Sequence, residues 1–162
     1  MKKTLTAIAL GLSIIGNAMA VEKHDKWIEI NGAFYSPFVG TTDGGVSFAT
    51  LYENKMGNIV ASIDFLNGSV TESDCKNAEL GKYNNTQPLN INGTLVKTTY
   101  GCVDKDRVKF FPITNAGQNH IISVFKASNT VTVSGDFTYS ANGFTKSYNT
   151  LKARNDKKKL AI

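Results

Sequence analysis

The chain holds two cysteines, Cys75 and Cys102, and two histidines, His24 and His120, and these side chains bound its reactive chemistry. A zinc site needs three or four ligands at short spacing, and a cysteine nucleophile needs a histidine within reach. The four residues lie far apart and form no signature of either kind. An oxidising compartment favours a disulfide between two such cysteines. We therefore predict the bond Cys75–Cys102, which stabilises the fold by roughly 3–4 kcal/mol on a chain-entropy argument.

No recognisable catalytic motif is present. The chain lacks G-x-S-x-G, the Walker loop, His-Glu-x-x-His and the EF-hand spacing. The stretch Asp104–Asp106 begins like a calcium loop, but it lacks the glycine and the final glutamate, so we interpret it as a turn. We expect no metal and no cofactor. The enzymatic alternative is a small hydrolase that uses His120 with a nearby carboxylate.

Aromatic side chains gather early in the chain, and we take this segment as the candidate binding face. A flexible turn, GTTDGG, follows the aromatic residues. Rings beside a flexible turn suit the binding of a sugar, a peptide or a partner protein, and the alternative is that they fill one end of the core. Basic residues interleave poorly with these rings, so we expect no nucleic-acid binding despite a net charge of +5. The candidate residues are Trp27, Tyr35, Phe38 and Asp43.

The first 20 residues have the pattern of a secretory signal peptide. Lys2 and Lys3 precede an apolar run from Leu5 to Ile15, and residues 18–20 form a small-x-small cleavage site. We predict cleavage after Ala20. No later segment approaches the roughly 20 apolar residues that a membrane-spanning helix needs, so we expect no span. The expected location is the periplasm or the extracellular space. The two lysines and the compact apolar run of the signal peptide are typical of a bacterial protein.

Short alternating segments separated by turn residues dominate the rest of the chain. Such spacing predicts a mainly β fold, an antiparallel β-sandwich or open barrel, in a single domain over residues 21–153. Pro112 indicates that its strand is short or lies at a sheet edge. Residues 73–87 are polar and are expected to form a loop with one helical turn around Asn77. The predicted strands cover 27–38, 46–52, 59–65, 89–100, 108–113 and 130–139.

One or two short helices are expected in the second half. Ile121, Ile122 and Phe125 suit one face of a helix that begins at Thr114 or Asn115 and stops at Asn129, although the same residues also favour a strand. A second helix is predicted over 140–151, because its aromatic and apolar residues recur at helical spacing. The run after Ala153 is rich in lysine, and we expect residues 154–162 to form a basic disordered tail.

The C-terminal half resembles the invasion-associated locus B family of small exported bacterial proteins. A strand ending at a Gly-Cys pair is followed by a short helix, a Val-rich strand and a Gly-Phe helix start. The N-terminal half departs from that pattern, because no cysteine follows Trp27 closely. The resemblance implies a cysteine-bearing β fold and an envelope role, and it supplies no catalytic residues. Its matching residues are Gly101, Cys102, Phe125, Val131, Val133, Gly143 and Phe144.

Together these features predict an exported, non-enzymatic binding protein whose partner is an envelope or host protein. The expected surface is the aromatic segment with its GTTDGG turn, and strand addition at exposed edges around Val108–Pro112 is a second mode. Besides the hydrolase, a structural envelope component is the remaining alternative. The sequence leaves the oligomeric state open.

Overall fold

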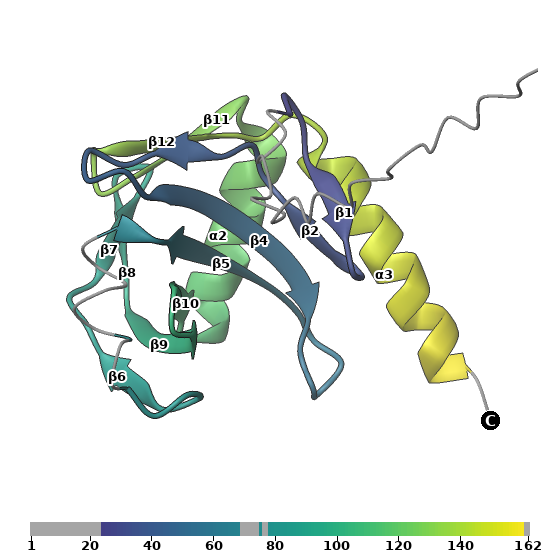
Figure 1. Ribbon diagram of the computed structural model, residues 1–162. Helices are drawn as coiled ribbons and strands as arrows, with labels where there is room; N and C mark the ends of the chain where they lie inside the picture. Colours follow the sequence, from purple (N-terminus) through teal and green to yellow (C-terminus); the bar gives the residue numbers. More distant parts are fainter. Residues whose placement is uncertain (1–23, 69–74, 76–77, 161–162) are drawn as a thin grey trace, which may run out of the picture.

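The structure is a computed structural model that describes residues 24–68, 75 and 78–160 (Figure 1). The predicted signal peptide, residues 1–20, and the predicted helical turn around Asn77 lie outside the described residues. The architecture is mainly β, with two open antiparallel sheets and two helices, α2 and α3, among the described residues. The predicted fold class is therefore confirmed, in its open-sheet form.

Sheet A, the larger sheet, contains eight strands within the part of the chain that the structure describes. Its main path runs β1-β2-β4-β5-β10-β9-β6, and β3 pairs with β4 beside that path. The long antiparallel pair of β4 and β5 follows from two alternating segments joined by the turn around Gly57. The strands are β1 (Ile28–Ile30), β2 (Ala33–Tyr35), β3 (Val39–Gly40), β4 (Val46–Glu53), β5 (Ile59–Leu66), β6 (Tyr83–Asn85), β9 (Thr98–Asp104) and β10 (Arg107–Pro112).

In sheet B the described residues form four strands in the order β12-β11-β7-β8. Two of its hairpin turns, Asn92-Gly93 and Ser134-Gly135, have positive φ at both residues. Asn92-Gly93 is a two-residue loop between Ile91 and Thr94, where a type I′ turn requires this conformation and asparagine and glycine adopt it readily. The β11–β12 connection has three residues, 134–136, between Val133 and Phe137. The strands are β7 (Leu89–Ile91), β8 (Thr94–Val96), β11 (Thr130–Val133) and β12 (Phe137–Ser140).

The segment that was ambiguous between helix and strand is helix α2 (Asn115–Ala127). Thr114 is its N-cap, and the Thr114 hydroxyl accepts a hydrogen bond of 3.0 Å from the backbone N–H of Gly117. Ile121 and Phe125 are each 1% exposed. Strands β4 and β5 curve in front of α2 in Figure 1, so the helix fills the inner side of sheet A.

Helix α3 (Phe144–Leu160) is longer than predicted, and over residues 154–160 it corrects the expectation of a disordered tail, whereas the last two residues of that predicted tail, 161–162, lie outside the described residues. The helix continues to Leu160 because polar side chains of its last turns bond to the sheet. Arg154 forms an ion pair with Glu29, and Lys158 forms one with Glu53 at 2.8 Å. Asn155 is buried and donates a hydrogen bond to the carbonyl of Gly57.

The hydrophobic core lies between the inner face of sheet A, sheet B and the two helices. Trp27 is 5% exposed, and its ring makes edge contacts with Phe125 and Phe144 at centroid distances of 5.4 and 4.9 Å. The indole N–H donates to the carbonyl of Ser140 at 2.9 Å. Trp27 is thus a core residue and offers no binding surface. For this residue the structure shows the alternative reading of the aromatic segment, in which the rings fill the core.

The predicted disulfide is confirmed. Cys75 and Cys102 are bonded, with their Cα atoms 5.5 Å apart, and they pack against Val108 in a small second cluster. Strand β10, which was expected at an exposed edge, lies between β5 and β9 instead. Neither α2 nor α3 is both long and apolar enough to cross a membrane, and these are the helices of the described residues.

Candidate functional site

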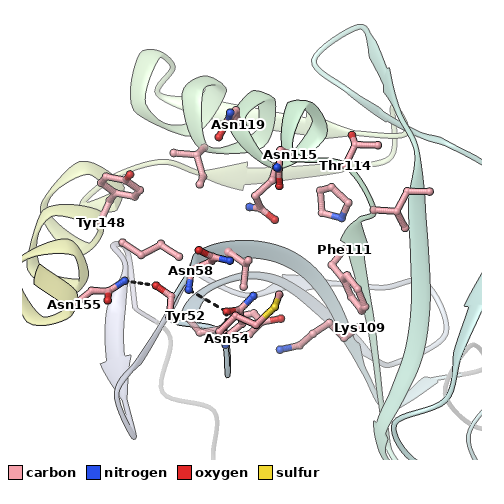
Figure 2. A pocket seen from close by; sticks show the side chains of 18 of the residues that line it. Tyr52, Asn54, Asn58, Lys109, Phe111, Thr114, Asn115, Asn119, Tyr148 and Asn155 are labelled. Carbon is pink, nitrogen blue, oxygen red and sulfur yellow. Dashed lines mark hydrogen bonds between the residues drawn. The ribbon is translucent and has the colours of Figure 1, made fainter. Parts of the chain in front are cut away.

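A groove of about 1260 Å³ opens where strands β5 and β10 separate. The two strands pair from Leu66 opposite Arg107 to Ile63 opposite Phe110. Beyond that point β5 continues to Ile59, whereas β10 ends at Pro112. A proline cannot donate to a strand ladder and is tolerated at a strand end. The loss of pairing leaves a space that α2 and α3 border on the other side (Figure 2).

Each helix presents one face to the groove. On α2, residues 115, 118, 119 and 122 line it, and they recur at the spacing of one helix face. On α3, residues 148, 152, 155, 156 and 159 do the same. Asn115 points from α2 toward the β4–β5 hairpin in Figure 2, and Tyr148 stands on the α3 side. The groove therefore has two helical walls, and its other borders come from sheet A.

Side-chain amides are the most frequent polar groups along the groove. We call this feature the amide groove, and it is bordered by amides from both helices and from the hairpin. The amide nitrogen of Gln118 is buried and has no hydrogen-bond partner among the described residues. An amide both donates and accepts hydrogen bonds and does not titrate near neutral pH. The residues are Asn54, Asn58, Asn115, Gln118, Asn119 and Asn155.

The hairpin that borders the groove is held by its own asparagine and by α3. The Asn54 side chain accepts hydrogen bonds of 3.0 Å from the backbone N–H groups of Met56 and Asn58. Gly57 has φ of 76°, a conformation that favours glycine, and its carbonyl accepts from Asn155. These contacts fix the hairpin against α3, so this border of the groove is preformed.

Lys109 brings a positive charge to the groove from β10. Its ammonium nitrogen lies 4.0 Å from the centroid of the Tyr52 ring and 3.8 Å from Oδ1 of Asp64. Burial lowers the pKa of Lys109, although the charge of Asp64 acts in the opposite direction. The Lys109 side chain is 16% exposed and lines the groove. Its ammonium group is therefore held in place while it faces the groove.

Asp64 holds this part of sheet A together from the outer face. Its carboxylate is fully buried and accepts hydrogen bonds from the hydroxyls of Thr50 at 2.8 Å and Ser62 at 2.9 Å. Arg107 completes the network, with its Nε 2.8 Å from the same carboxylate. Burial alone lowers the pKa of Arg107, but the charge and hydrogen bond of Asp64 raise it overall. Because these partners come from β4, β5 and β10, the network fixes the positions of three strands.

The residues predicted as a binding face do not form a single surface. Tyr35 and Phe38 are half-buried and both contact Phe48 on the outer face of sheet A, with centroid distances of 5.7 and 5.0 Å. Trp27 lies in the core on the opposite side. Asp43 holds the GTTDGG turn, accepting hydrogen bonds from the Thr41 hydroxyl and the Gly45 backbone. Apart from Tyr35 and Phe38, the predicted set is not brought together.

The two histidines lie outside the amide groove. The Nε2 atom of His120 bonds to the carbonyl of Ile91 at 3.1 Å, and no carboxylate of the described residues bonds to His120. His24 bonds through Nδ1 to the carbonyl of Lys26 at 2.7 Å, and its ring contacts Phe38. In the described part of the chain, no three His, Cys, Asp or Glu side chains gather as a metal ion would need.

The amide groove is the feature that sequence reasoning missed. Its hairpin asparagines also have a local role, because the Asn54 side chain accepts hydrogen bonds within the turn. The available signal was the spacing of Asn115, Gln118 and Asn119 on the predicted helix, which places three amides on one face. The groove itself depends on where β5 and β10 part, and no local pattern encodes that point.

Comparison with known proteins returned no match: no protein-family model, no curated protein and no solved structure is similar to this chain. The fold and the amide groove are therefore interpreted from the geometry of this structure alone.

Proposed function

We propose that this protein is an exported, non-enzymatic binding protein that holds a partner protein in the amide groove. The observation that carries the proposal is the set of side-chain amides on both helical walls and on the hairpin. Amides recognise polar partners by hydrogen bonds and do not exchange protons as catalytic acids and bases do. The preformed hairpin border supports the proposal, because a rigid site loses less conformational entropy on binding.

Export is part of the proposal. The predicted signal peptide directs the chain to the periplasm or out of the cell, and the Cys75–Cys102 disulfide fits an oxidising compartment. The resemblance to the invasion-associated locus B family implies an envelope role. We accordingly propose an envelope or host protein as the partner.

A photo-crosslinking amino acid at position 119 tests the site. Asn119 is exposed and borders the groove, whereas Asn129 is exposed and lies outside it, so position 129 is the matched control. The purified protein is mixed with the envelope fraction and culture fluid of its native cells and irradiated. We expect one abundant protein crosslinked from position 119 and absent from position 129.

A second pair of variants separates the groove from the first-predicted face. Asn115→Ala combined with Gln118→Ala removes two amides of α2 and keeps position 119 for the crosslinking residue, and alanine favours the helix at both positions. Tyr35→Ala combined with Phe38→Ala alters the outer face of sheet A. Loss of crosslinking in the first pair supports the proposal. Loss only in the second pair, or equal crosslinking from positions 119 and 129, places the partner elsewhere and refutes it.

A further inference from the structure

We propose that the end of the molecule formed by the β4–β5 hairpin and the last turns of α3 docks onto a membrane surface that carries anionic phospholipids. We call this end the basic tip, and it consists of residues 53–58 and 152–160. The inference goes beyond the proposed function, because it concerns the surface on which the exported protein lies and not the partner that it holds.

Contacts between the hairpin and α3 hold the basic tip together as one surface. Asn155 donates a hydrogen bond to the carbonyl of Gly57, and Lys158 forms an ion pair with Glu53 at 2.8 Å. The loop after β4 and the last turn of α3 both lie at the lower side of the molecule in Figure 1. Side chains about a hundred residues apart in sequence are therefore presented at the same end.

The two most exposed large apolar side chains of the described residues lie on the basic tip. Met56 and Leu160 are each 80% exposed, and the next in order, Leu95 of sheet B, is 70% exposed. Met56 is in the hairpin turn, and Leu160 is the last residue of α3. A single exposed apolar residue is common on a protein surface. Two at one projecting end, with lysines beside them, suit entry into the boundary between lipid headgroups and acyl chains.

Lysines dominate the rest of the basic tip. It contains six cationic side chains but only two carboxylates, Glu53 and Asp156. The net charge of the whole chain is +5, so this end carries most of the excess positive charge of the protein. The cationic residues are Lys55, Lys152, Arg154, Lys157, Lys158 and Lys159.

Half of these cations have no carboxylate partner. Ion pairs within the protein occupy the other three. Lys55, Lys157 and Lys159 are exposed, and no ion pair among the described residues involves them. The phosphate groups of anionic lipids would supply their counter-charges, and each lysine near such a surface adds to the attraction.

The helix dipole does not account for the whole arrangement. Cations in the last turn of a helix interact favourably with its carbonyl end, and Lys157–Lys159 have that local role. The dipole gives no reason for Lys55, which belongs to the hairpin, or for the two exposed apolar side chains. A lipid surface accounts for all of them, because lysines meet phosphates while apolar groups reach below the headgroups. Met56 and Lys159 also border the amide groove, so docking would place the groove beside the membrane.

Co-sedimentation with lipid vesicles tests the docking. The protein is purified from the exported fraction, so that the predicted signal peptide does not bind lipid itself. Vesicles are made of phosphatidylcholine alone or of phosphatidylcholine mixed with phosphatidylglycerol. We expect binding to the mixed vesicles, little binding to the neutral ones, and release at high salt, because salt screens exposed charges.

Two lysines outside the amide groove are then replaced. Lys55→Gln combined with Lys157→Gln should weaken binding to the mixed vesicles by roughly 10- to 30-fold. The matched control combines Lys105→Gln with Lys146→Gln, which removes the same charge from exposed positions outside the basic tip. The control should bind like the wild type. Neither pair alters a residue that lines the amide groove.

A tryptophan reporter tests the apolar contact. Trp27 is the only native tryptophan and is buried in the core, so its emission should not respond to vesicles. The emission of the Leu160→Trp variant should shift to shorter wavelength with the mixed vesicles and be quenched by brominated lipid. The Leu95→Trp variant, which changes an exposed leucine of sheet B, is the control and should show neither effect.

Four outcomes overturn the inference: no binding to the mixed vesicles, equal binding to the neutral ones, equal weakening by the two lysine pairs, or no emission shift in the Leu160→Trp variant. Soluble polyphosphate is the probe for an acidic polymer, and binding to it without binding to vesicles also overturns membrane docking. Crosslinking from position 119 is independent of these results, because Lys55, Lys157 and Leu160 lie outside the amide groove. Failure of membrane docking therefore leaves the proposed function standing.

Discussion

At the scale of single residues, a buried carboxylate, that of Asp64, fixes the side chains around it on one side of the groove. Asp64 receives hydrogen bonds from Thr50, Ser62 and Arg107, so the carboxylate is fully satisfied. A buried carboxylate is costly unless it is paired and hydrogen-bonded in this way. Lys109, next to this network, keeps donors facing the groove. The network therefore positions Lys109, which lines the groove.

Tyr52 gives a prediction about alkaline stability. Burial of the ring, with the nearby charge of Asp64, raises the pKa of Tyr52 to about 12. The folded protein keeps the phenol proton at pH values where the unfolded chain, with a tyrosine pKa of about 10, releases it. This contribution to the free energy of unfolding is fully present below pH 10 and is lost as the pH rises from about 10 to 12.

We expect the wild type to lose about 2 kcal/mol more unfolding free energy than Tyr52→Phe between pH 9 and pH 12. Urea unfolding at half-unit pH steps measures the difference, and groups common to both proteins cancel. Tyr148→Phe, which removes a half-buried phenol whose charge does not act on Tyr52, is the matched control. Parallel curves for wild type and Tyr52→Phe would contradict the prediction.

At the scale of secondary-structure elements, polar anchors decide where α3 ends. The lysine-rich sequence after Ala153 has little apolar character, and hydrophobic periodicity predicted that order stops there. In the fold, Arg154 and Lys158 reach carboxylates on β1 and β4, and Asn155 reaches the β4–β5 hairpin. The helix continues because its partners are supplied by strands that are about a hundred residues distant in sequence.

Asn155→Ala tests this anchoring. The substitution leaves the Gly57 carbonyl without its donor and removes a buried side chain, so we expect a loss of about 1–3 kcal/mol in unfolding free energy. We also expect faster proteolysis within residues 54–58, because the hairpin loses its contact with α3. Thermal unfolding and limited proteolysis measure the two effects. Lys157→Ala, an exposed neighbour on the same helix, serves as the control, and an equal effect in both variants rules out the anchor.

At the scale of the whole molecule, the disulfide joins the small cluster around Val108 to the segment that contains Cys75. The bond spans 27 residues of sequence. Such a crosslink reduces the conformational freedom of the unfolded chain more than that of the folded one. Strand β9, which carries Cys102, also borders the groove. The crosslink thus stabilises the sheet from which one side of the groove is built.

Replacing both cysteines by alanine should lower the free energy of unfolding by roughly 3–4 kcal/mol. Urea unfolding of the variant and of the wild type in reducing agent measures the effect, and the two should agree. A variant as stable as the oxidised wild type would show that the crosslink contributes nothing.

The sequence by itself determined most local structure and one long-range link. Interactions over only a few residues set the Asn-Gly and Ser-Gly turns, the Thr114 cap and the alternating segments. These features can therefore be predicted without knowledge of the fold. The Cys75–Cys102 bond was predictable because only two thiols exist to pair. Tertiary structure alone decided that Trp27 faces the core, that β10 is interior and that α3 reaches Leu160.

The amide groove is also a feature that tertiary structure alone decided. It exists because β5 and β10 stop pairing after Ile63 and Phe110, and because two helices place their amides opposite that gap. Each amide had a sufficient local explanation as a turn or helix-surface residue. Their convergence depends on pairings between segments distant in sequence, and those pairings are set by the burial of the whole core.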